Sequence, residues 1–259
     1  MRLVKPSIRL IARPAVDFEE VQDFLHEIDA EQFDFGERQP DGQSLIEIAG
    51  RNCYKSWVPG LNRNVTKVRS EQDDYLANII AQKHGSVLEH AQWSFIINNV
   101  SRVFTHELVR HRVGVAISQE SLRYVRLDEL DMWIPDWARN DTELFANIQD
   151  LVHRMEDMQR WMATRFKLDD PDVKFSEKKV KTSFMRRFAP EGLATRMVWS
   201  ANARTIRHVI EMRTSSGAEE EMRIVAKQLL DIMVDEAPLL FADYIDPGDG
   251  SATTSHPKI

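Results

Sequence analysis

From Gln92 to Arg112 the chain reads QWSFIINNVSRVFTHELVRHR, which holds a strand pattern, a helix pattern and a basic run in one short stretch. The part that ends at Val100 is rich in apolar and aromatic residues and is predicted to form a strand. The part from Ser101 to Arg110 is predicted to form a helix that carries Val103, Phe104 and Leu108 towards the core. A strand followed directly by a helix favours a fold that mixes both kinds of element.

On either side of this stretch, helix patterns outnumber strand patterns. A strand is expected at residues 7–12 and another at 193–199, and helices at 17–30, 44–51, 70–83, 142–168, 177–187, 202–213 and 218–233. The predicted fold class is therefore α+β, a helix-rich single domain with a small antiparallel or mixed sheet. Residues 1–247 are expected to form one catalytic domain, and the polar residues 248–259 a disordered tail.

Composition narrows the class of protein. The chain has 259 residues, of which 42% are hydrophobic, and a net charge of -7. An acidic protein lacks the basic footprint of general nucleic-acid binding, so no nucleic-acid partner is expected. No apolar run is long enough to cross a bilayer, and residues 1–6 lack the apolar core of a signal peptide, so no membrane partner is expected. The single cysteine, Cys53, excludes an internal disulfide and fits a cytoplasmic location.

The basic run Arg110-His111-Arg112 is followed closely by Ser121-Leu122-Arg123-Tyr124. Guanidinium groups match phosphates and carboxylates in bidentate geometry and stay charged at neutral pH. The segment therefore suggests a site for a phosphorylated ligand. A solvated basic face, with its arginines paired to nearby carboxylates, is an equally good interpretation of these residues alone.

A second segment with unusual chemistry is the helix predicted at residues 202–213. Ala203, Ile206 and Ile210 share one apolar face, and Arg213 projects from the end of that stripe. A poorly solvated guanidinium would attract an anionic or polarisable partner. The alternative pairs Arg213 with Glu219 or Glu220 across the following turn.

Other reactive side chains give weaker signals. His84, His90, His106 and His111 lie close in sequence, but their spacing matches no metal motif, so no metal site is assigned. A buried imidazole held by a carboxylate is the alternative for His90. A small buried side chain is favoured over a nucleophile for Cys53. Glycine-rich phosphate loops are missing from the sequence, so a nucleotide cofactor would have to be held by side chains.

Taken together, these segments resemble the flavin-dependent thymidylate synthases (the ThyX family). The resemblance rests on Arg110-His111-Arg112 with Ser121-Leu122-Arg123-Tyr124, on the segment 49–54, on the block 84–90 and on the segment from Asn202 to Glu221. It covers residues 49 to 235. Eight residues separate Arg112 from Ser121 where the family pattern has seven, and Glu107 stands where a glutamine is usual.

This resemblance implies an enzyme that converts dUMP to dTMP in dTMP biosynthesis. Methylenetetrahydrofolate would be the one-carbon donor of this methyltransferase, and NADPH would reduce the FAD cofactor. The resemblance also implies a homotetramer whose active sites draw on several subunits. A catalytic role is implied for Arg213, which would stabilise negative charge on the pyrimidine and so activate its C5 atom. No cysteine nucleophile is needed, because the flavin carries the redox chemistry.

The resemblance also implies two sets of contacts. The substrate-binding residues would be Glu107, Arg110, Gln119, Glu120, Ser121, Leu122, Arg123, Arg186 and Arg213, with Arg123 and Arg186 as phosphate ligands. The flavin-binding residues would be His84, Ser86, Arg110, His111, Arg112, Gln119, Asn202, Arg204 and His208. The alternative function is a non-catalytic nucleotide- or anion-binding module. A metal-dependent phosphohydrolase and a nucleic-acid binder account for fewer of the residues.

Overall fold

The computed structural model describes residues 1–37, 39–65 and 67–259. Its internal contacts divide the chain into two compact units, each assembled from three separate segments. Unit 1 consists of residues 1–7, 96–110 and 117–198, and unit 2 consists of residues 8–95, 111–116 and 199–259. The assignment of residues 1–247 to one catalytic domain therefore stays a prediction.

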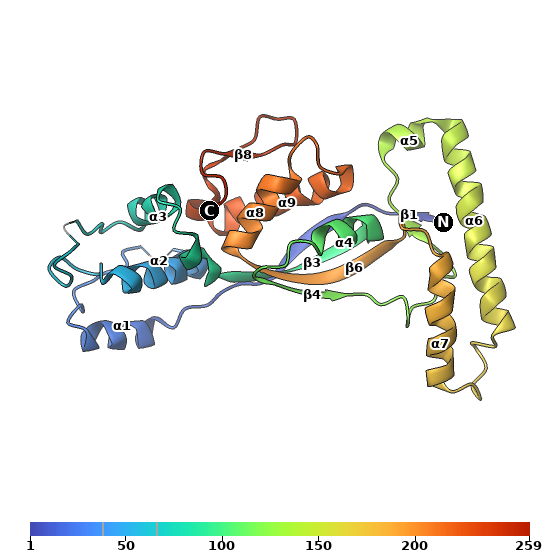
Figure 1. Cartoon of the computed structure of the whole chain (residues 1–259), viewed down its shortest axis with the longest axis horizontal. Helices are drawn as coiled ribbons and strands as arrows, with labels where there is room; N and C mark the ends of the chain where they lie inside the picture. The colour runs from blue at the N-terminus through green and yellow to red at the C-terminus, as the bar shows by residue number, and fades with distance from the viewer. Residues whose placement is uncertain (38, 66) are drawn as a thin grey trace. The chain divides into compact units, whose positions relative to one another are not determined.

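Helices make up most of the regular structure, as the sequence predicts (Figure 1). Their bounds are α1 Phe18–Glu27, α2 Asp41–Tyr54, α3 Gln72–Ala81, η1 Gly85–Glu89, α4 Arg102–Leu108, α5 Asp136–Asn140, α6 Thr142–Arg165, α7 Phe175–Met185, η2 Arg186–Phe188, α8 Ala203–Arg213, α9 Glu220–Glu236 and α10 Pro238–Phe241. Several starts are fixed by side-chain caps: Asp17, Ser101, Asp141 and Asn202 each accept a backbone N–H from the first turn of the helix that follows. Helix α3, which was expected to start at residue 70, begins after Glu71 and has no side-chain cap.

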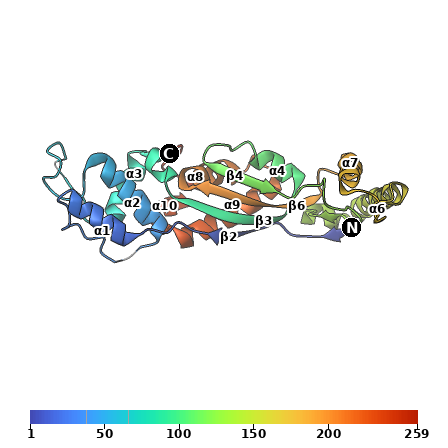
Figure 2. The same ribbon diagram turned by 90° about the horizontal axis from the view of Figure 1, so that it is seen from below.

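The strands form three small sheets. Their bounds are β1 Arg2–Leu3, β2 Ser7–Ala12, β3 Gln92–Ser101, β4 Val115–Gln119, β5 Asp131–Met132, β6 Ala194–Asn202, β7 Tyr244–Ile245 and β8 Thr253–Thr254. A four-stranded sheet has the order β2-β3-β6-β4 (Figure 2), while β1 pairs with β5 in parallel and β7 pairs with β8 antiparallel. The helix-rich α+β prediction with small sheets is confirmed.

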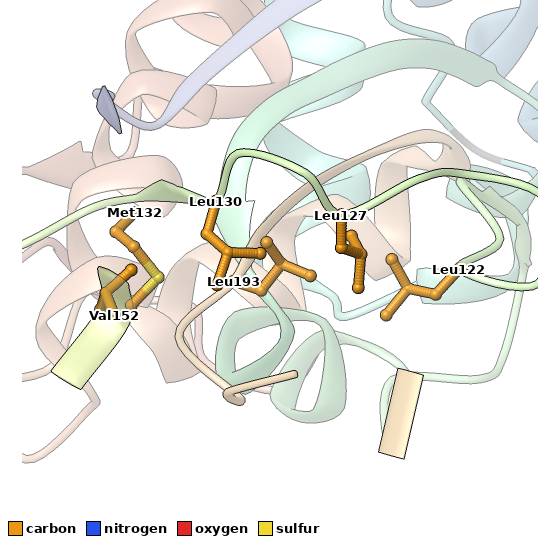
Figure 3. Packing of buried hydrophobic residues seen from close by; sticks show 6 residues of the cluster. All are labelled: Leu122, Leu127, Leu130, Met132, Val152 and Leu193. Atoms are coloured by element: carbon orange, nitrogen blue, oxygen red, sulfur yellow. The ribbon is translucent and has the colours of Figure 1, made fainter. Parts of the chain in front are cut away.

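The core of unit 1 centres on a cluster of Leu122, Leu127, Leu130, Met132, Val152 and Leu193, all of them less than 8% exposed. Figure 3 shows Leu193 between Leu130 and Leu127 within this cluster. Next to it, α6 and α7 are joined by a hydrogen bond from Gln159 Nε2 to the carbonyl oxygen of Met185, 3.1 Å long. These contacts hold the segment after β4 and the end of α7 in one packed body.

In unit 2, helix α8 packs against α9, and Ala203, Ile206 and Ile210 are fully buried, as their shared face predicts. A second cluster, made by Leu25, Ala30, Phe33, Trp57 and Val58, joins α1 to α2 and to the loop after it.

Some side chains lie where the sequence did not predict them. Val103 is 39% exposed, because α4 buries only Phe104 and Leu108 of its predicted apolar face. His90 and Cys53 are exposed, so the interpretation of each as a buried side chain is wrong. Residues 248–259, expected to be disordered, instead contact α8, and strand β8, which lies in this segment, pairs with β7.

Candidate functional site

The predicted substrate-binding residues, apart from Arg213, all lie in unit 1. Glu107 at the end of α4 pairs with Arg110 one turn later, with a nitrogen–oxygen distance of 3.2 Å. Gln119 at the end of β4 donates from Nε2 to the Thr105 hydroxyl over 3.3 Å. The second contact holds α4 beside the end of β4.

In the segment after β4, side chains alternate between the interior and the surface. Leu122 is 5% exposed and belongs to the unit 1 core (Figure 3), so only its backbone can reach a ligand. Glu120 pairs with Arg196 over 2.9 Å, and both line a cavity of about 180 Å³ together with Leu122. Arg123 is exposed. This alternation separates the inward-facing Glu120 and Leu122 from the outward-facing Arg123.

The backbone of Arg123 lies against α7, and Arg186 follows the end of this helix. The Thr182 hydroxyl on α7 donates to the carbonyl oxygen of Arg123 over 2.7 Å, and Arg186 lies four residues after Thr182, one turn further along. Both side chains are exposed, and neither forms an ion pair with the residues that the structure describes. Exposed guanidinium groups without an ion pair are suited to binding a phosphate.

An aromatic cluster lies next to these arginines. The Tyr124 ring stacks on Phe175, with centroids 6.1 Å apart and planes 7° apart, and Lys179 Nζ lies 5.1 Å from the centre of the Tyr124 ring. The hydrogen bond and positive charge of Lys179 lower the pKa of the Tyr124 phenol. The neighbourhood of Arg123 is therefore positive, which favours an anionic ligand.

Most of the predicted flavin-binding residues lie in unit 2. His84 precedes η1 and stacks on Tyr54, with ring centroids 5.5 Å apart and planes 23° apart. The Tyr54 hydroxyl is 3.4 Å from Nδ1 of the same imidazole. Ser86 follows in η1 with an exposed side chain. An exposed pair of stacked rings beside a hydroxyl can receive a planar ligand.

Helix α8 presents a polar face opposite its buried stripe. Asn202 caps the helix, accepting the Thr205 N–H at 2.9 Å, while Arg204 and His208 are exposed and lie one turn apart. Arg204 Nη1 pairs with Glu89 over 2.5 Å. The same local periodicity that buries Ala203 and Ile206 therefore directs Arg204 and His208 outwards.

Arg213, at the end of α8, contacts the basic run directly. Its Nε donates to Nε2 of His111 over 2.9 Å, although the two residues are 102 positions apart in sequence. The imidazole of His111 is therefore the acceptor that orients the Arg213 guanidinium in this arrangement. The His111 ring also meets the His208 ring edge-on, with centroids 5.3 Å apart. His111, His208 and Arg213 thus converge in unit 2, whereas Arg112 is exposed on the chain next to them.

The residues of unit 2 fit a large anionic, planar cofactor. Their donors are guanidinium and imidazole groups, which suit phosphate oxygens and ring carbonyls. The backbone approach is also close: a Cβ on Gly114, which has a φ of +66°, would lie 2.1 Å from Nδ2 of Asn202. The chain therefore needs glycine at this position, because any other residue would displace the Asn202 side chain.

Two partners of the site could not be identified from motifs. Glu89, which fixes Arg204, was recognised only as part of the His84–His90 block. Tyr54 belongs to the segment 49–54 that resembles the family, and its stacking on His84 depends on the packing of α2 against η1. An aromatic residue at the end of a helix was the only signal for Tyr54, and this signal is weak.

Two kinds of feature are missing from the part of the chain that the structure describes. In residues 1–37, 39–65 and 67–259, no group of three or more His, Cys, Asp or Glu side chains could hold a metal ion. Within the same ranges, no helix combines the length and the apolar character that crossing a membrane requires.

Comparison with known sequences gives a consistent result. A sequence model of the family described as "Thymidylate synthase complementing protein" matches residues 36–239. A flavin-dependent thymidylate synthase of Mycolicibacterium vanbaalenii is 34% identical over 221 residues, which are 83% of this chain and 86% of that protein. One from Mycobacterium sp. (strain JLS) is 34% identical over 260 residues, covering 97% of this chain and 96% of the relative.

Solved structures share the fold. A UMP/dUMP methylase, PolB, from Streptomyces cacaoi bound with 5-Br UMP has a TM-score of 0.61 at 16% identity, covering 93% of this chain and 95% of the other. Thymidylate synthase X (ThyX) from Helicobacter pylori with FAD and dUMP has a TM-score of 0.56 at 24% identity, covering 78% of this chain and 93% of the other.

Proposed function

Because the chain belongs to the thymidylate synthase complementing protein family, we propose that its two sets of polar residues are the nucleotide and flavin sites of one enzyme. The enzyme is a flavin-dependent thymidylate synthase, which converts dUMP to dTMP with FAD as its cofactor. The observation that carries the assignment of residues is the Arg213–His111 contact, which joins the two segments singled out in the sequence.

In this proposal Arg213 acts on the pyrimidine. The uracil C5 atom is a poor nucleophile, and positive charge beside N3 and its neighbouring carbonyls favours the electron-rich form of the ring. His111 accepts the Nε–H of Arg213 and so orients the guanidinium. A fixed guanidinium needs little reorganisation as charge develops on the substrate, which is the condition for electrostatic catalysis.

The other residues bind and orient. Arg123 and Arg186 hold the nucleotide phosphate, because both are exposed and lack ion-pair partners among the described residues, and the backbone of Arg123 contacts the helix that Arg186 follows. His84, Arg204 and His208 hold FAD, which when bound supplies the reducing equivalents for the new methyl group. Ser121 positions the nucleotide, and its Oγ accepts a hydrogen bond from the Arg123 backbone N–H over 3.4 Å. Because Ser121 does not act as a nucleophile in this proposal, it needs no adjacent general base.

The co-substrates and the assembly extend the same proposal. Methylenetetrahydrofolate supplies the one-carbon unit and NADPH reduces the flavin, in keeping with the family.

A homotetramer is supported by large apolar side chains that α6 and α7 leave exposed, among them Trp161 at 62% and Phe175 at 70%. A cytoplasmic location is supported by the single, exposed Cys53. Light scattering that shows a fully active monomer would contradict the tetramer.

The first experiment is a visible absorption spectrum of the purified protein, repeated anaerobically after addition of NADPH and then with dUMP and methylenetetrahydrofolate. Flavin bands that bleach on reduction, together with formation of dTMP, support the proposed function. A colourless protein that does not take up added FAD contradicts it. Binding of dUMP without flavin uptake or turnover would favour the nucleotide-binding module.

The Arg213→Ala variant tests the role of the guanidinium. We expect dTMP formation to fall at least about 100-fold, as for loss of one preorganised donor, with FAD still bound. Arg9→Ala, a change of the same kind at an exposed position of β2 outside both sets of residues, serves as the matched control for loss of charge. Turnover of Arg213→Ala within about fivefold of the wild type would exclude the proposed role of this residue.

A further inference from the structure

Residues 249–259, called the strap below, lie along α8 from its last turn to its first. Near the end of the helix, the Ala252 N–H donates to the Thr214 hydroxyl over 3.0 Å. Further along, the Lys258 N–H donates to Glu211 over 3.1 Å. At the start of the helix, Arg204 Nε donates to the carbonyl oxygen of Ile259 over 3.1 Å. The strap therefore contacts both ends of the helix that carries Arg204 and Arg213.

The strap is anchored by packing as well as by these hydrogen bonds. Ala252 is 4% exposed and Ile259 is 7% exposed, so both of these apolar residues of the strap are buried. Thr254 pairs with Tyr244 across β7 and β8, and its hydroxyl donates to Asp243. Asp243 in turn pairs with the buried Arg207 of α8 over 2.6 Å. The strap is thus attached to α8 at several positions along the helix.

Gly85 marks the point where the strap meets the predicted flavin-binding residues. A Cβ on Gly85 would lie 2.7 Å from the backbone carbon of Ile259 and 2.8 Å from Nε of Arg204. Any side chain here would push the strap or the guanidinium away. On the other side of the contact, Lys83 Nζ donates to the carbonyl oxygen of Pro257 over 3.3 Å. The turn between His84 and Ser86 is therefore built around the strap and Arg204.

These contacts hold the Arg204 guanidinium from two sides. Nε is bound to Ile259 and Nη1 to Glu89, and Nη2 has no partner among the residues of unit 2 that the structure describes. The side chain keeps an exposed edge while its rotamer is fixed. An arginine that is already ordered loses less conformational freedom when it binds an anion, and so binds it more tightly.

We propose that the strap is a positioning element of the flavin site, which fixes Arg204 through the carbonyl of Ile259. Its contacts with Glu211 and Thr214 also bracket Arg213, because these residues lie on either side of it in α8. The inference rests on the proposed function, since it assumes that Arg204 binds FAD. Ile259 is a positioning residue, because it acts through Arg204.

A matched pair of substitutions tests the strap. Ile259→Gly removes the buried side chain that anchors the carbonyl. Lys258→Gly changes the adjacent exposed residue, whose φ of +58° glycine adopts without strain. In titrations of flavin-free protein with FAD, followed by flavin fluorescence, we expect Ile259→Gly to raise the Kd about tenfold. Lys258→Gly should change it less than about twofold.

A double-mutant cycle with Arg204→Ala separates positioning from a general loss of structure. If the strap acts through Arg204, Ile259→Gly has no further effect on the FAD Kd in the Arg204→Ala background. An equal, additive effect in both backgrounds would overturn the inference. Ile259→Ala, a smaller change, provides the same cycle should Ile259→Gly not fold.

The other outcomes are distinct. Wild-type protein that does not bind FAD contradicts the proposed function and, with it, this inference. Wild-type protein that binds FAD with the same Kd as Ile259→Gly contradicts the strap alone. Tighter binding by Ile259→Gly would show that the strap obstructs the site, and would also overturn the proposal.

Discussion

Two pairs of arginines in this molecule have the same side chain in opposite surroundings. Arg51 and Arg207, in unit 2, are 0% and 3% exposed, and each guanidinium donates to a carboxylate within the fold. Arg123 and Arg186, in unit 1, are exposed and form no ion pair with the described residues. The difference identifies which guanidinium groups have their binding capacity used within the fold and which can bind a ligand.

Arg51 illustrates the saturated case. Its nitrogens donate to Glu47 over 2.8 Å, to the Ser56 carbonyl over 2.9 Å and to the Arg69 carbonyl over 2.8 Å. The guanidinium also lies 4.3 Å from the centre of the Tyr75 ring, and burial raises the pKa of that phenol to about 12. Such a side chain organises a core, although it lies within a segment that resembles a family motif.

The comparison predicts the largest change for the buried ion pair of α2. Replacing Arg51 with alanine leaves the Glu47 carboxylate, which is 1% exposed, without its counter-charge. We expect the free energy of unfolding to fall by about 3–5 kcal/mol. Urea denaturation followed by circular dichroism measures this, with Arg187→Ala at an exposed position as control. A loss below about 1 kcal/mol would show that the pair is not structural.

The second buried pair predicts a pH dependence. Burial alone would raise the pKa of the Asp243 carboxyl, but hydrogen bonding and charge from Arg207, with a hydrogen bond from Thr254, lower it overall. A depressed pKa contributes stability above the unfolded value of about 3.9, and this contribution is lost as the pH falls through the folded pKa.

Asp243→Asn should therefore lower the free energy of unfolding by about 3 kcal/mol at pH 7, with the gap narrowing below about pH 4. Thermal unfolding of the wild type and Asp243→Asn between pH 7 and pH 3 measures the gap. A gap that stays constant over this range would refute the linkage between the carboxylate and stability.

The exposed arginines predict the reverse pattern, a loss of binding without a loss of stability. Each of Arg123→Ala and Arg186→Ala should raise the KM for dUMP by about tenfold or more, since a charge-assisted hydrogen bond contributes about 1.5–3 kcal/mol. Unfolding free energies should change by less than about 0.5 kcal/mol. Arg187→Ala again serves as the control. Unchanged KM values in both variants would remove the phosphate assignment.

The smallest effect is expected at Cys53, which shows that exposure alone does not make a side chain functional. Its thiol is exposed at the end of α2, and the proposed chemistry assigns it no role. Cys53→Ala should retain turnover within about twofold and unchanged FAD binding. An inactive Cys53→Ala that still binds flavin would contradict the mechanism built on Arg213.

Much of the fold follows from local patterns. The long helix α6 and the pair α8 and α9 were predicted within a few residues, because helical periodicity and caps are encoded nearby. Strand β4 was not predicted, since Val115–Gln119 is short and lies at one edge of its sheet, where pairing rather than sequence determines the strand. The exposure of Val103, the early start of α2 at Asp41 and the packing of residues 248–259 also depend on tertiary contacts.

The candidate site likewise has features that the local sequence predicts and features that depend on tertiary contacts. The arginines could be selected as candidates from the sequence, because clustered positive charge in an acidic protein calls for a partner. The sequence could not show which of these arginines form contacts within the fold, since the contact of Arg213 with His111 spans 102 residues. The inward orientation of Glu120 and Leu122 likewise depends on β6 and the unit 1 core.

The interleaved make-up of the two units has a consequence for how such a protein arises. The chain passes from one unit to the other at residues 7/8, 95/96, 110/111, 116/117 and 198/199. Neither unit corresponds to a continuous stretch of gene, so neither can be copied, fused or exchanged by a single recombination event. Contacts within each unit also join distant parts of the chain, which slows folding, because long loops must close before those contacts form. Insertions that lengthen surface loops are the form of variation that such a chain accommodates most readily.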